Sequence, residues 1–294
     1  MFQAIGYFVT LFATTIMTVV TAVIGSDTLP RALVTMADTE RAFAKLGYDT
    51  NYRDAFIQYF ADEAIDFNPE PGPALDRLRQ QPRPPSDLRL VWEPRVGDIA
   101  MSGDLGYLTG PTETRRSDTV TRHGNYFSVW KKQADGRYKV ILDVGAGASE
   151  KSEFAEGFMR AAAVATYHGT DTKAAAESSL LTADQAFSAA LASRGAAAAY
   201  GETLHGSARV HRSGSPSMTT RDAAVGWMRE RVTAMTSVPI KSETAQSRDL
   251  GYTWGSWAAT MSGSKTDKGF YVRVWTRAAD GKWWIAADVT QELR

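Results

Sequence analysis

The sequence contains nearly the same heptapeptide twice, as DLGYLTG at residues 104–110 and as DLGYTWG at residues 249–255, an offset of 145. At the same offset, residues 124–144 and 269–289 are identical at nine of 21 positions without a gap. Upstream, ERAFAKL at 40–46 matches DQAFSAAL at 184–191 at an offset of 144. An offset shared by three separate segments indicates the tandem duplication of one domain of about 115 residues.

The duplication predicts a first copy at residues 31–147 and a second at 178–294, joined by a partly helical linker at 148–177. Each copy begins with apolar residues at helical spacing and continues with alternating segments punctuated by glycine. Asp-Gly pairs at 135–136 and 280–281 lie between alternating runs and predict hairpins. The expected fold class is α+β, with helices on one face of an antiparallel sheet in each copy.

The last strand of each copy alternates between apolar residues and others. In the first copy, alternation places Tyr138, Val140, Leu142 and Val144 on one face, which we expect to be the core face. The equivalent face of the second copy carries Trp283, Ile285, Ala287 and Val289. Strict alternation then puts Asp143 and Asp288 on the opposite face, away from any pocket, which favours a structural role for them.

The first 26 residues form an apolar segment without a charge, and the first basic residue is Arg31. This segment is expected to be a secretory signal peptide or a membrane anchor formed by residues 4–25; a buried core helix is the third alternative. The first two alternatives predict an exported protein, either periplasmic or extracellular.

The composition excludes several function classes. The 33 basic and 33 acidic residues cancel, so no basic excess points to nucleic acid. The absence of cysteine excludes disulfides, thiolate nucleophiles and zinc–thiolate sites. No phosphate loop, dinucleotide fingerprint or nucleophile elbow is present, and we expect neither a cofactor nor a metal.

The segments SGDLGYLTGP and HGNYFSVWKKQADGRYKVILDVG resemble the SnoaL-like and ketosteroid-isomerase-like domains of the nuclear transport factor 2-like superfamily. The resemblance covers nearly all of residues 35–147 and, more loosely, residues 180–294. It implies two tandem cone-like domains, each with N-terminal helices packed in a strongly curved antiparallel sheet that encloses a pocket. Because such domains often dimerise through the convex sheet face, it also implies an intramolecular pseudo-dimer of the two copies, and it is compatible with a homo-oligomer.

Isomerases of this superfamily need a carboxylate or imidazole base in an apolar pocket, and two residues are candidates. Asp66 lies on the first strand of the first copy, where the second copy has Val210. His211 lies where the first copy has Phe67, and its ordinary pKa suits acid–base work. The alternative is that Asp66 and His211 are structural or surface groups. His205 and His211 lack a carboxylate at ligand spacing, so they do not predict a metal site.

Aromatic residues on the strands could line a pocket for a flat ligand or could fill a core. Arg273 lies between two of them and could bind an anion or form an ion pair. The candidates for ligand binding are Tyr107, Tyr126, Trp130, Tyr252, Trp254, Tyr271, Arg273 and Trp275. The second copy has His211, Trp254 and Arg273 where the first has Phe67, Thr109 and Ser128, so we expect the second copy to bind the ligand.

The leading functional expectation is an exported tandem protein that binds a small apolar or aromatic molecule, or acts as a scaffold, without turnover. The alternative is a ketosteroid-isomerase-like or dehydratase-like enzyme with Asp66 or His211 as general base. A further alternative is an envelope protein that acts through protein contacts.

Overall fold

The computed structural model describes residues 29–67, 70–161 and 167–293. The predicted signal peptide or anchor at residues 1–26 lies outside these residues. None of the helices in the described residues is long and apolar enough to cross a bilayer.

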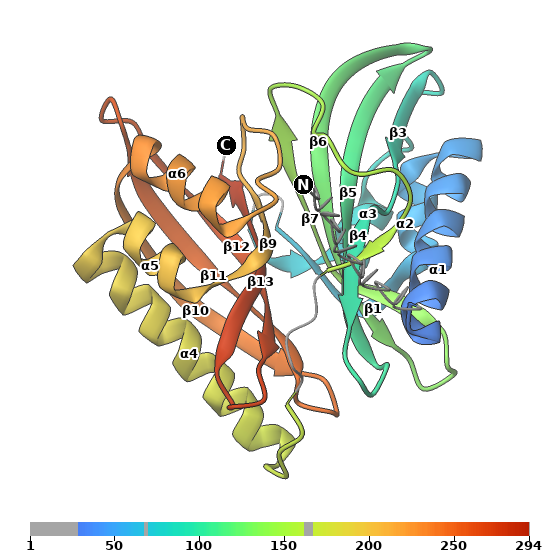
Figure 1. The fold of residues 1–294 in the computed structure, drawn as a ribbon. Helices are drawn as coiled ribbons and strands as arrows, with labels where there is room; N and C mark the ends of the chain where they lie inside the picture. Colours follow the sequence, from blue (N-terminus) through green and yellow to red (C-terminus); the bar gives the residue numbers. More distant parts are fainter. Residues whose placement is uncertain (1–28, 68–69, 162–166, 294) are drawn as a thin grey trace, which may run out of the picture.

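The first copy begins with helices and ends in a meander of long strands (Figure 1). Asn51 caps the second helix by accepting a hydrogen bond from the backbone N–H of Asp54 at 2.9 Å. The elements are α1 (Arg31–Asp49), α2 (Tyr52–Tyr59), β1 (Phe60–Asp66), β2 (Gly72–Pro73), α3 (Ala74–Gln80), β3 (Leu88–Trp92), β4 (Val96–Ile99), β5 (Leu105–Arg116), β6 (Thr119–Lys132), β7 (Tyr138–Ala148) and β8 (Met159–Arg160).

The second copy has a similar succession of elements, with one long strand where the first copy has β3 and β4 and without counterparts of the short strands β2 and β8. Thr172 and Thr220 cap its first and third helices through their side chains. The elements are α4 (Lys173–Arg194), α5 (Ala196–Thr203), β9 (Leu204–His211), α6 (Arg221–Arg231), β10 (Val232–Thr244), β11 (Leu250–Met261), β12 (Thr266–Arg277) and β13 (Trp283–Glu292).

Over the described residues, the strands form two sheets, with the orders β2-β1-β7-β6-β5-β4-β8 and β10-β11-β12-β13-β9, and β3 also pairs with β5. The predicted α+β class is confirmed. The sheets are not wholly antiparallel as expected, because β1 runs parallel to β7 and β9 runs parallel to β13. In each of these two pairs, a helix and several strands lie between the partners in the chain, which leaves room for the crossover that a parallel pair needs.

The segment predicted as a linker also contributes to the fold. Its strand β8 pairs with β4 of the first sheet, through Val96 opposite Met159. Its C-terminal end already belongs to the second copy, because α4 begins at Lys173.

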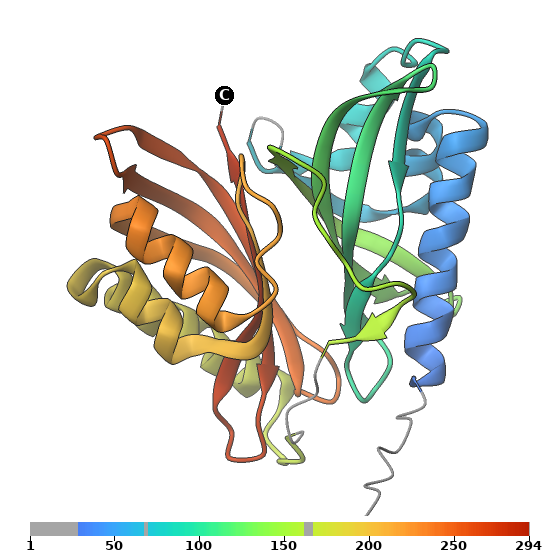
Figure 2. The same cartoon turned by 45° about the horizontal axis from the view of Figure 1, so that its top comes forward.

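The two sheets face each other in the middle of the molecule, and the helices cover their outer faces (Figures 1 and 2). Buried side chains of the described residues form three hydrophobic clusters. One lies between α1–α3 and the first sheet, and one between α4–α6 and the second. The third joins the sheets, with Tyr107, Phe127 and Leu142 on one side and Tyr252 and Val272 on the other.

A β-bulge reverses the alternation of each last strand. In the first sheet, Trp130 pairs with Val140 but Val129 pairs with Leu142, so Ile141 is an extra residue; Ala286 is the equivalent extra residue in the second sheet. The predicted single core face was therefore wrong. Tyr138 and Val140, like Trp283 and Ile285, face the helices. Leu142 and Val144, like Ala287 and Val289, face the other sheet. Asp143 and Asp288 consequently point into the interior of their own copies.

The repeated DLGY motif lies where the two copies touch. Asp104 accepts a hydrogen bond from the backbone N–H of Gln246 at 3.1 Å, and Asp249 accepts one from the backbone N–H of Met101 at 3.1 Å. The hydroxyls of Ser102 and Ser247 lie 2.7 Å apart. At the offset of 145, Asp104 is equivalent to Asp249, Met101 to Gln246 and Ser102 to Ser247. The contacts are therefore reciprocal, and the two copies use the same surface to meet.

The glycines of the motif allow the helices and neighbouring strands to come close. A Cβ at Gly106 would lie 2.7 Å from both the Asp98 carbonyl oxygen and the Met36 Cε, and one at Gly251 would lie 2.6 Å from Leu180. Met36 is on α1 and Leu180 on α4, so both motif glycines make room for the first helix of their copy.

Candidate functional site

The interior of the first copy contains a cavity of about 270 Å³ between its helices and the concave face of its sheet. Apolar side chains from α1, α2 and β3 form one wall, namely Phe43, Phe56, Leu90 and Trp92. The sheet supplies Thr112, Tyr126 and Asp143, and Arg122 lies at one end. The cavity is thus mostly apolar with a few polar groups, the arrangement typical of a small-molecule site.

Small residues keep this cavity open. Gly145 and Gly147 are on the strand that carries Asp143, and both line the cavity. At the equivalent positions the second copy has Thr290 and Glu292, and it has Trp257 in place of Thr112. The Trp257 indole donates hydrogen bonds to the backbone oxygens of Phe270 at 3.1 Å and Gln291 at 3.3 Å. The indole is therefore fixed where the first copy has open space.

Asp143 and His123 are titratable groups on the sheet wall of this cavity, and Asp143 is the carboxyl among its lining residues. The bulge at Ile141 turns the half-buried carboxyl of Asp143 inward, where Ser128 donates a hydrogen bond to it at 2.8 Å. The pKa of Asp143 is raised to about 7, mainly by burial and to a smaller extent by the charge of Asp66, against the opposing effect of the Ser128 hydrogen bond. A carboxyl with this pKa can both accept and return a proton near neutral pH.

Tyr126 lies on the same inward face, two residues from Ser128 on β6. Its hydroxyl is buried and has no hydrogen-bond partner in the described part of the chain. Burial, followed by the charges of Glu40 and Asp143, raises the pKa of Tyr126 well above its ordinary value, so the hydroxyl keeps its proton. An unpaired buried donor is costly unless something else accepts its hydrogen bond.

Glu40 lies beneath the cavity and is fully buried. Its two oxygens accept hydrogen bonds from the indole of Trp92 at 2.7 Å and from the indole of Trp130 at 2.9 Å. Burial raises the pKa of Glu40 to about 8, although the two indole donors lower it. Because Trp92 lines the cavity and Glu40 holds its ring, Glu40 positions part of the wall.

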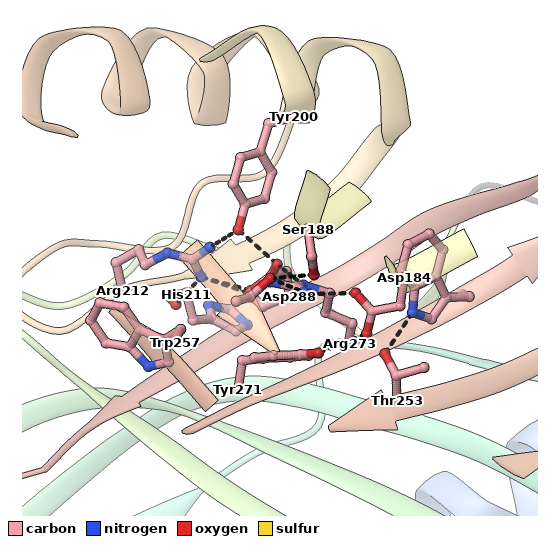
Figure 3. A network of polar contacts seen from close by, with 12 residues as sticks. Asp184, Ser188, Tyr200, His211, Arg212, Thr253, Trp257, Tyr271, Arg273 and Asp288 are labelled. Carbon is pink, nitrogen blue, oxygen red and sulfur yellow. Dashed lines mark hydrogen bonds and ion pairs between the residues drawn. The ribbon is translucent and has the colours of Figure 1, made fainter. Parts of the chain in front are cut away.

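The interior of the second copy is instead filled by a network of charged side chains (Figure 3). The Arg273 guanidinium is fully buried and donates hydrogen bonds to Asp184 at 2.6 Å and to Asp288 at 2.8 Å. Arg212 forms an ion pair with Asp288 at 3.0 Å, and the Tyr200 hydroxyl donates to Asp288 at 2.9 Å. Two arginines and two aspartates balance each other in charge, as a buried network requires.

The equivalent aspartates of the two copies therefore differ. Burial alone would raise the pKa of Asp288, but the charges of Arg212 and Arg273 outweigh it and hold the pKa below its ordinary value. Ser128, the counterpart of Arg273, supplies no charge to Asp143. The same backbone position thus carries a permanent anion in one copy and a proton-exchanging group in the other.

A smaller cavity of about 110 Å³ remains in the second copy, lined by Trp227, Met228, Met235, Trp257 and Arg212 among others. Arg212 is already bonded to Tyr200 and Asp288, so its guanidinium is not available as an acid or base. Two carboxyl residues, Asp267 and Glu292, also line this cavity, and Asp267 forms an ion pair with Lys265 at 2.7 Å.

His211 and Trp254, expected in a pocket of the second copy, lie between the two copies instead. His211 Nε2 lies 2.9 Å from Thr109 Oγ1, and this hydroxyl donates its own proton to the Tyr126 carbonyl at 2.6 Å. The histidine must therefore donate from Nε2. Trp254 packs against Phe67, with ring centroids 5.7 Å apart. His211 and Phe67 are equivalent positions, as are Trp254 and Thr109, so these two contacts are the two halves of one repeated pairing.

Burial, followed by the charges of Arg212 and Arg209, lowers the pKa of His211 to about 3. The imidazole is fully buried, and its Nδ1 has no hydrogen-bond partner within the described residues. This position and pKa favour a neutral interface group over a base in a pocket.

The other predicted site residues fall into two groups. Tyr107 and Tyr252 belong to the cluster between the sheets, whereas Trp130, Tyr271, Arg273 and Trp275 lie inside their own copies. Asp66 ends β1 and forms an ion pair with Arg77; it does not line the cavity but acts electrostatically on Asp143. Of the predicted ligand-binding residues, Tyr126 lines the cavity of the first copy, and none lines the smaller cavity of the second copy.

Sequence reasoning assigned no site role to Glu40, Ser128 or Asp143. Alternation without a bulge turned Asp143 outward. For Glu40 a signal was present, because the offset of 144 pairs it with Asp184, and both acids lie among apolar residues of the first helix. Across the ranges that the structure describes, no group of three His, Asp or Glu side chains could hold a metal ion.

Solved structures with a similar fold were found. A nuclear transport factor 2-like superfamily protein from Salmonella enterica has 7% sequence identity and a TM-score of 0.33, over 41% of this chain and 93% of its own. A protein assigned as a ketosteroid isomerase from Parabacteroides distasonis has 18% identity and a TM-score of 0.31, over 38% of this chain and 87% of its own. Each match spans about the length of one copy.

No protein-family model matches the chain. No curated protein matches it either.

Proposed function

We propose that the first copy binds a small, mostly apolar carbonyl compound and that Asp143 moves a proton on it. The observation that carries this proposal is the carboxyl of Asp143, with a pKa of about 7, on the wall of an apolar cavity that also contains the unpartnered Tyr126 hydroxyl. A site for binding alone does not need a carboxyl held at this pKa, which costs stability at neutral pH. This reasoning favours the isomerase-like alternative over binding without turnover.

The proposed step is proton abstraction next to a carbonyl group. The Asp143 carboxylate takes the proton from the adjacent carbon, the C–H electron pair forms a carbon–carbon double bond, and the carbonyl π electrons move to the oxygen. Tyr126 donates a hydrogen bond to the resulting enolate oxygen. Protonated Asp143 then returns its proton to the same carbon, or to a conjugated one, which completes exchange or isomerisation.

The test is exchange of the methylene protons of 2-tetralone in deuterated buffer, followed by NMR. We expect Asp143→Asn to lower the protein-catalysed rate by about 100-fold or more. The exposed Asp62 on β1 supplies a matched control, and Asp62→Asn should leave the rate unchanged. The wild-type rate should rise with pH and level off above about 7, as Asp143 loses its proton. Exchange that survives Asp143→Asn, or 2-tetralone binding without any exchange, would overturn proton transfer; the second result would favour binding without turnover.

We further propose that the copies form an intramolecular pseudo-dimer and that the chain is exported. The reciprocal contacts of Asp104 and Asp249 and the shared cluster of the two sheets support the first statement. The apolar character of residues 4–25 supports the second. Fractionation of cells that produce the full chain tests export, and recovery of the protein in the cytosol alone would contradict it.

A further inference from the structure

The cavity of the first copy has one end marked by a free positive charge. Arg122 lines the cavity, its side chain is exposed, and it forms no ion pair or side-chain hydrogen bond with any described residue. Two other arginines of the same hairpin are paired: Arg115 with Glu113 and Arg116 with Asp87. Arg122 is thus available to a ligand in a way that its neighbours are not.

The second copy shows that the fold does not require this charge. The residue equivalent to Arg122 is Asp267, which lines the smaller cavity and forms an ion pair with Lys265 at 2.7 Å. The second copy therefore has a paired carboxylate where the first copy has a guanidinium that is unpaired among the described residues. Because the strand is retained with either sign, the charge of Arg122 serves something other than folding.

The distance along β6 sets the shape of a ligand that would use both ends. Ser128 on β6 donates a hydrogen bond to Asp143 and so lies beside it. Arg122 lies six residues before Ser128 on the same strand. Six residues of extended strand span roughly 20 Å between Cα atoms. Across β5, Leu90 is in register with Arg122, and Trp92 is in register with Gly124, between Arg122 and Ser128. Both side chains line the cavity. A ligand that touches both ends is elongated and apolar in its middle.

We propose that the first copy selects an elongated carbonyl compound that carries a carboxylate at the end opposite the reacting carbonyl group, and that Arg122 binds this carboxylate. The proposal rests on the proposed function, because Asp143 defines the reacting end. A single unpaired guanidinium offsets one negative charge and offers the paired N–H donors that a carboxylate accepts.

The probes are 6-acetyl-2-naphthoate and its neutral analogue 6-acetyl-2-naphthamide, which place an acetyl group and a carboxylate or amide at opposite ends of one ring system. Their affinities for the full chain are measured by calorimetry at low and at physiological salt. We expect the carboxylate to bind about fivefold tighter than the amide at low salt, with a smaller preference at higher salt. Arg122→Gln should abolish the preference, and Arg122→Asp, which copies Asp267, should reverse it.

Two controls locate the effect. Arg116→Gln removes an exposed arginine of the same hairpin and should leave the preference intact. Thr112→Trp copies Trp257 and should block binding of both probes. Equal affinities of the two probes for the wild type, no binding of the carboxylate at millimolar concentration, a preference that survives Arg122→Gln, or binding that survives Thr112→Trp would each overturn the proposal.

The acetyl protons separate this inference from the proposed function. If the Arg122-dependent preference is present but Asp143→Asn does not affect acetyl proton exchange, carboxylate recognition stands and proton transfer fails. If exchange depends on Asp143 but the probes bind equally, proton transfer stands and carboxylate recognition fails.

Discussion

Asp143 illustrates at the scale of one residue how a proton-transfer group costs stability. Its pKa of about 7 in the folded protein exceeds the ordinary value of 3.8, so the folded state holds a proton that the unfolded state releases. Its contribution to stability is complete below about pH 4 and is lost as the pH rises towards 7. We expect Asp143→Asn to raise the free energy of unfolding by about 2 kcal/mol at pH 8, a value reduced from the full shift for partial exposure. The variant should gain nothing at pH 4, and urea unfolding at the two pH values checks this.

The equivalent substitution in the second copy supplies the contrast. Asp288→Asn removes a carboxylate that is paired with both Arg273 and Arg212, so these buried guanidinium groups lose part of their compensating charge. The substitution should therefore lower the free energy of unfolding by about 3–5 kcal/mol at pH 8. Equal effects of the two substitutions would show that the copies do not differ electrostatically as described.

His211 makes a second prediction about pH, with the opposite sign. Its folded pKa of about 3 lies below the ordinary value of 6.5, so the folded state excludes a proton that the unfolded state binds. The contribution of neutral His211 is complete above about pH 6.5 and is lost as the pH falls towards 3. Because the unfolded state takes up the proton, this residue alone should lower the free energy of unfolding of the wild type by about 2 kcal/mol as the pH falls from 6.5 to 5. In His211→Phe, which copies Phe67, this part of the pH dependence should be absent from the unfolding curves; an unchanged slope would contradict the neutral interface histidine.

Two elements, the β-bulges of β7 and β13, explain which part of the site could be predicted from the sequence. The helices, the hairpins at the Asp-Gly pairs and the α+β class follow from local patterns, and Gly136 and Gly281 both have the expected positive φ of 86°. A bulge leaves no such pattern, because Ile141 and Ala286 are apolar and continue an apolar strand. The sequence therefore predicted a strand containing Asp143 but gave its carboxyl the wrong face. The contacts between His211 and Thr109 depend on how the sheets meet, which local alternation does not encode.

The close approach of α1 to β5 gives a prediction at the same scale. A methyl group at Gly106 would overlap the Asp98 carbonyl and the Met36 side chain, both at 2.7 Å from the Cβ position. Gly106→Ala should therefore lower the free energy of unfolding by about 1–3 kcal/mol. Gly145→Ala is the matched control, because its nearest contact is 3.7 Å away and its effect should be below about 1 kcal/mol. Thermal unfolding of both variants tests whether β5 needs a glycine for packing.

At the scale of the whole molecule, the His211–Thr109 contact between the copies can be changed to match the equivalent Phe67–Trp254 contact. His211→Phe removes the donor to Thr109, and Thr109→Trp places an indole against the imidazole of His211. Each change alone should destabilise the chain. The double variant recreates the ring contact that Phe67 and Trp254 make on the other side of the interface. We expect the double variant to be more stable than the sum of the single effects by about 1 kcal/mol or more in a double-mutant cycle at pH 7. Additive effects would mean that the two positions do not form one coupled contact.

The unlike contacts of this interface have a genetic consequence. In a protein assembled from two identical chains, a mutation appears on both sides at once, so Phe67 could not become histidine in one partner while it stayed phenylalanine in the other. A duplicated gene removes that restraint, and each half can accept a change that only the other half accommodates. The halves then cease to be interchangeable: a chain built from two first copies would oppose Phe67 with Thr109, and one built from two second copies would oppose His211 with Trp254.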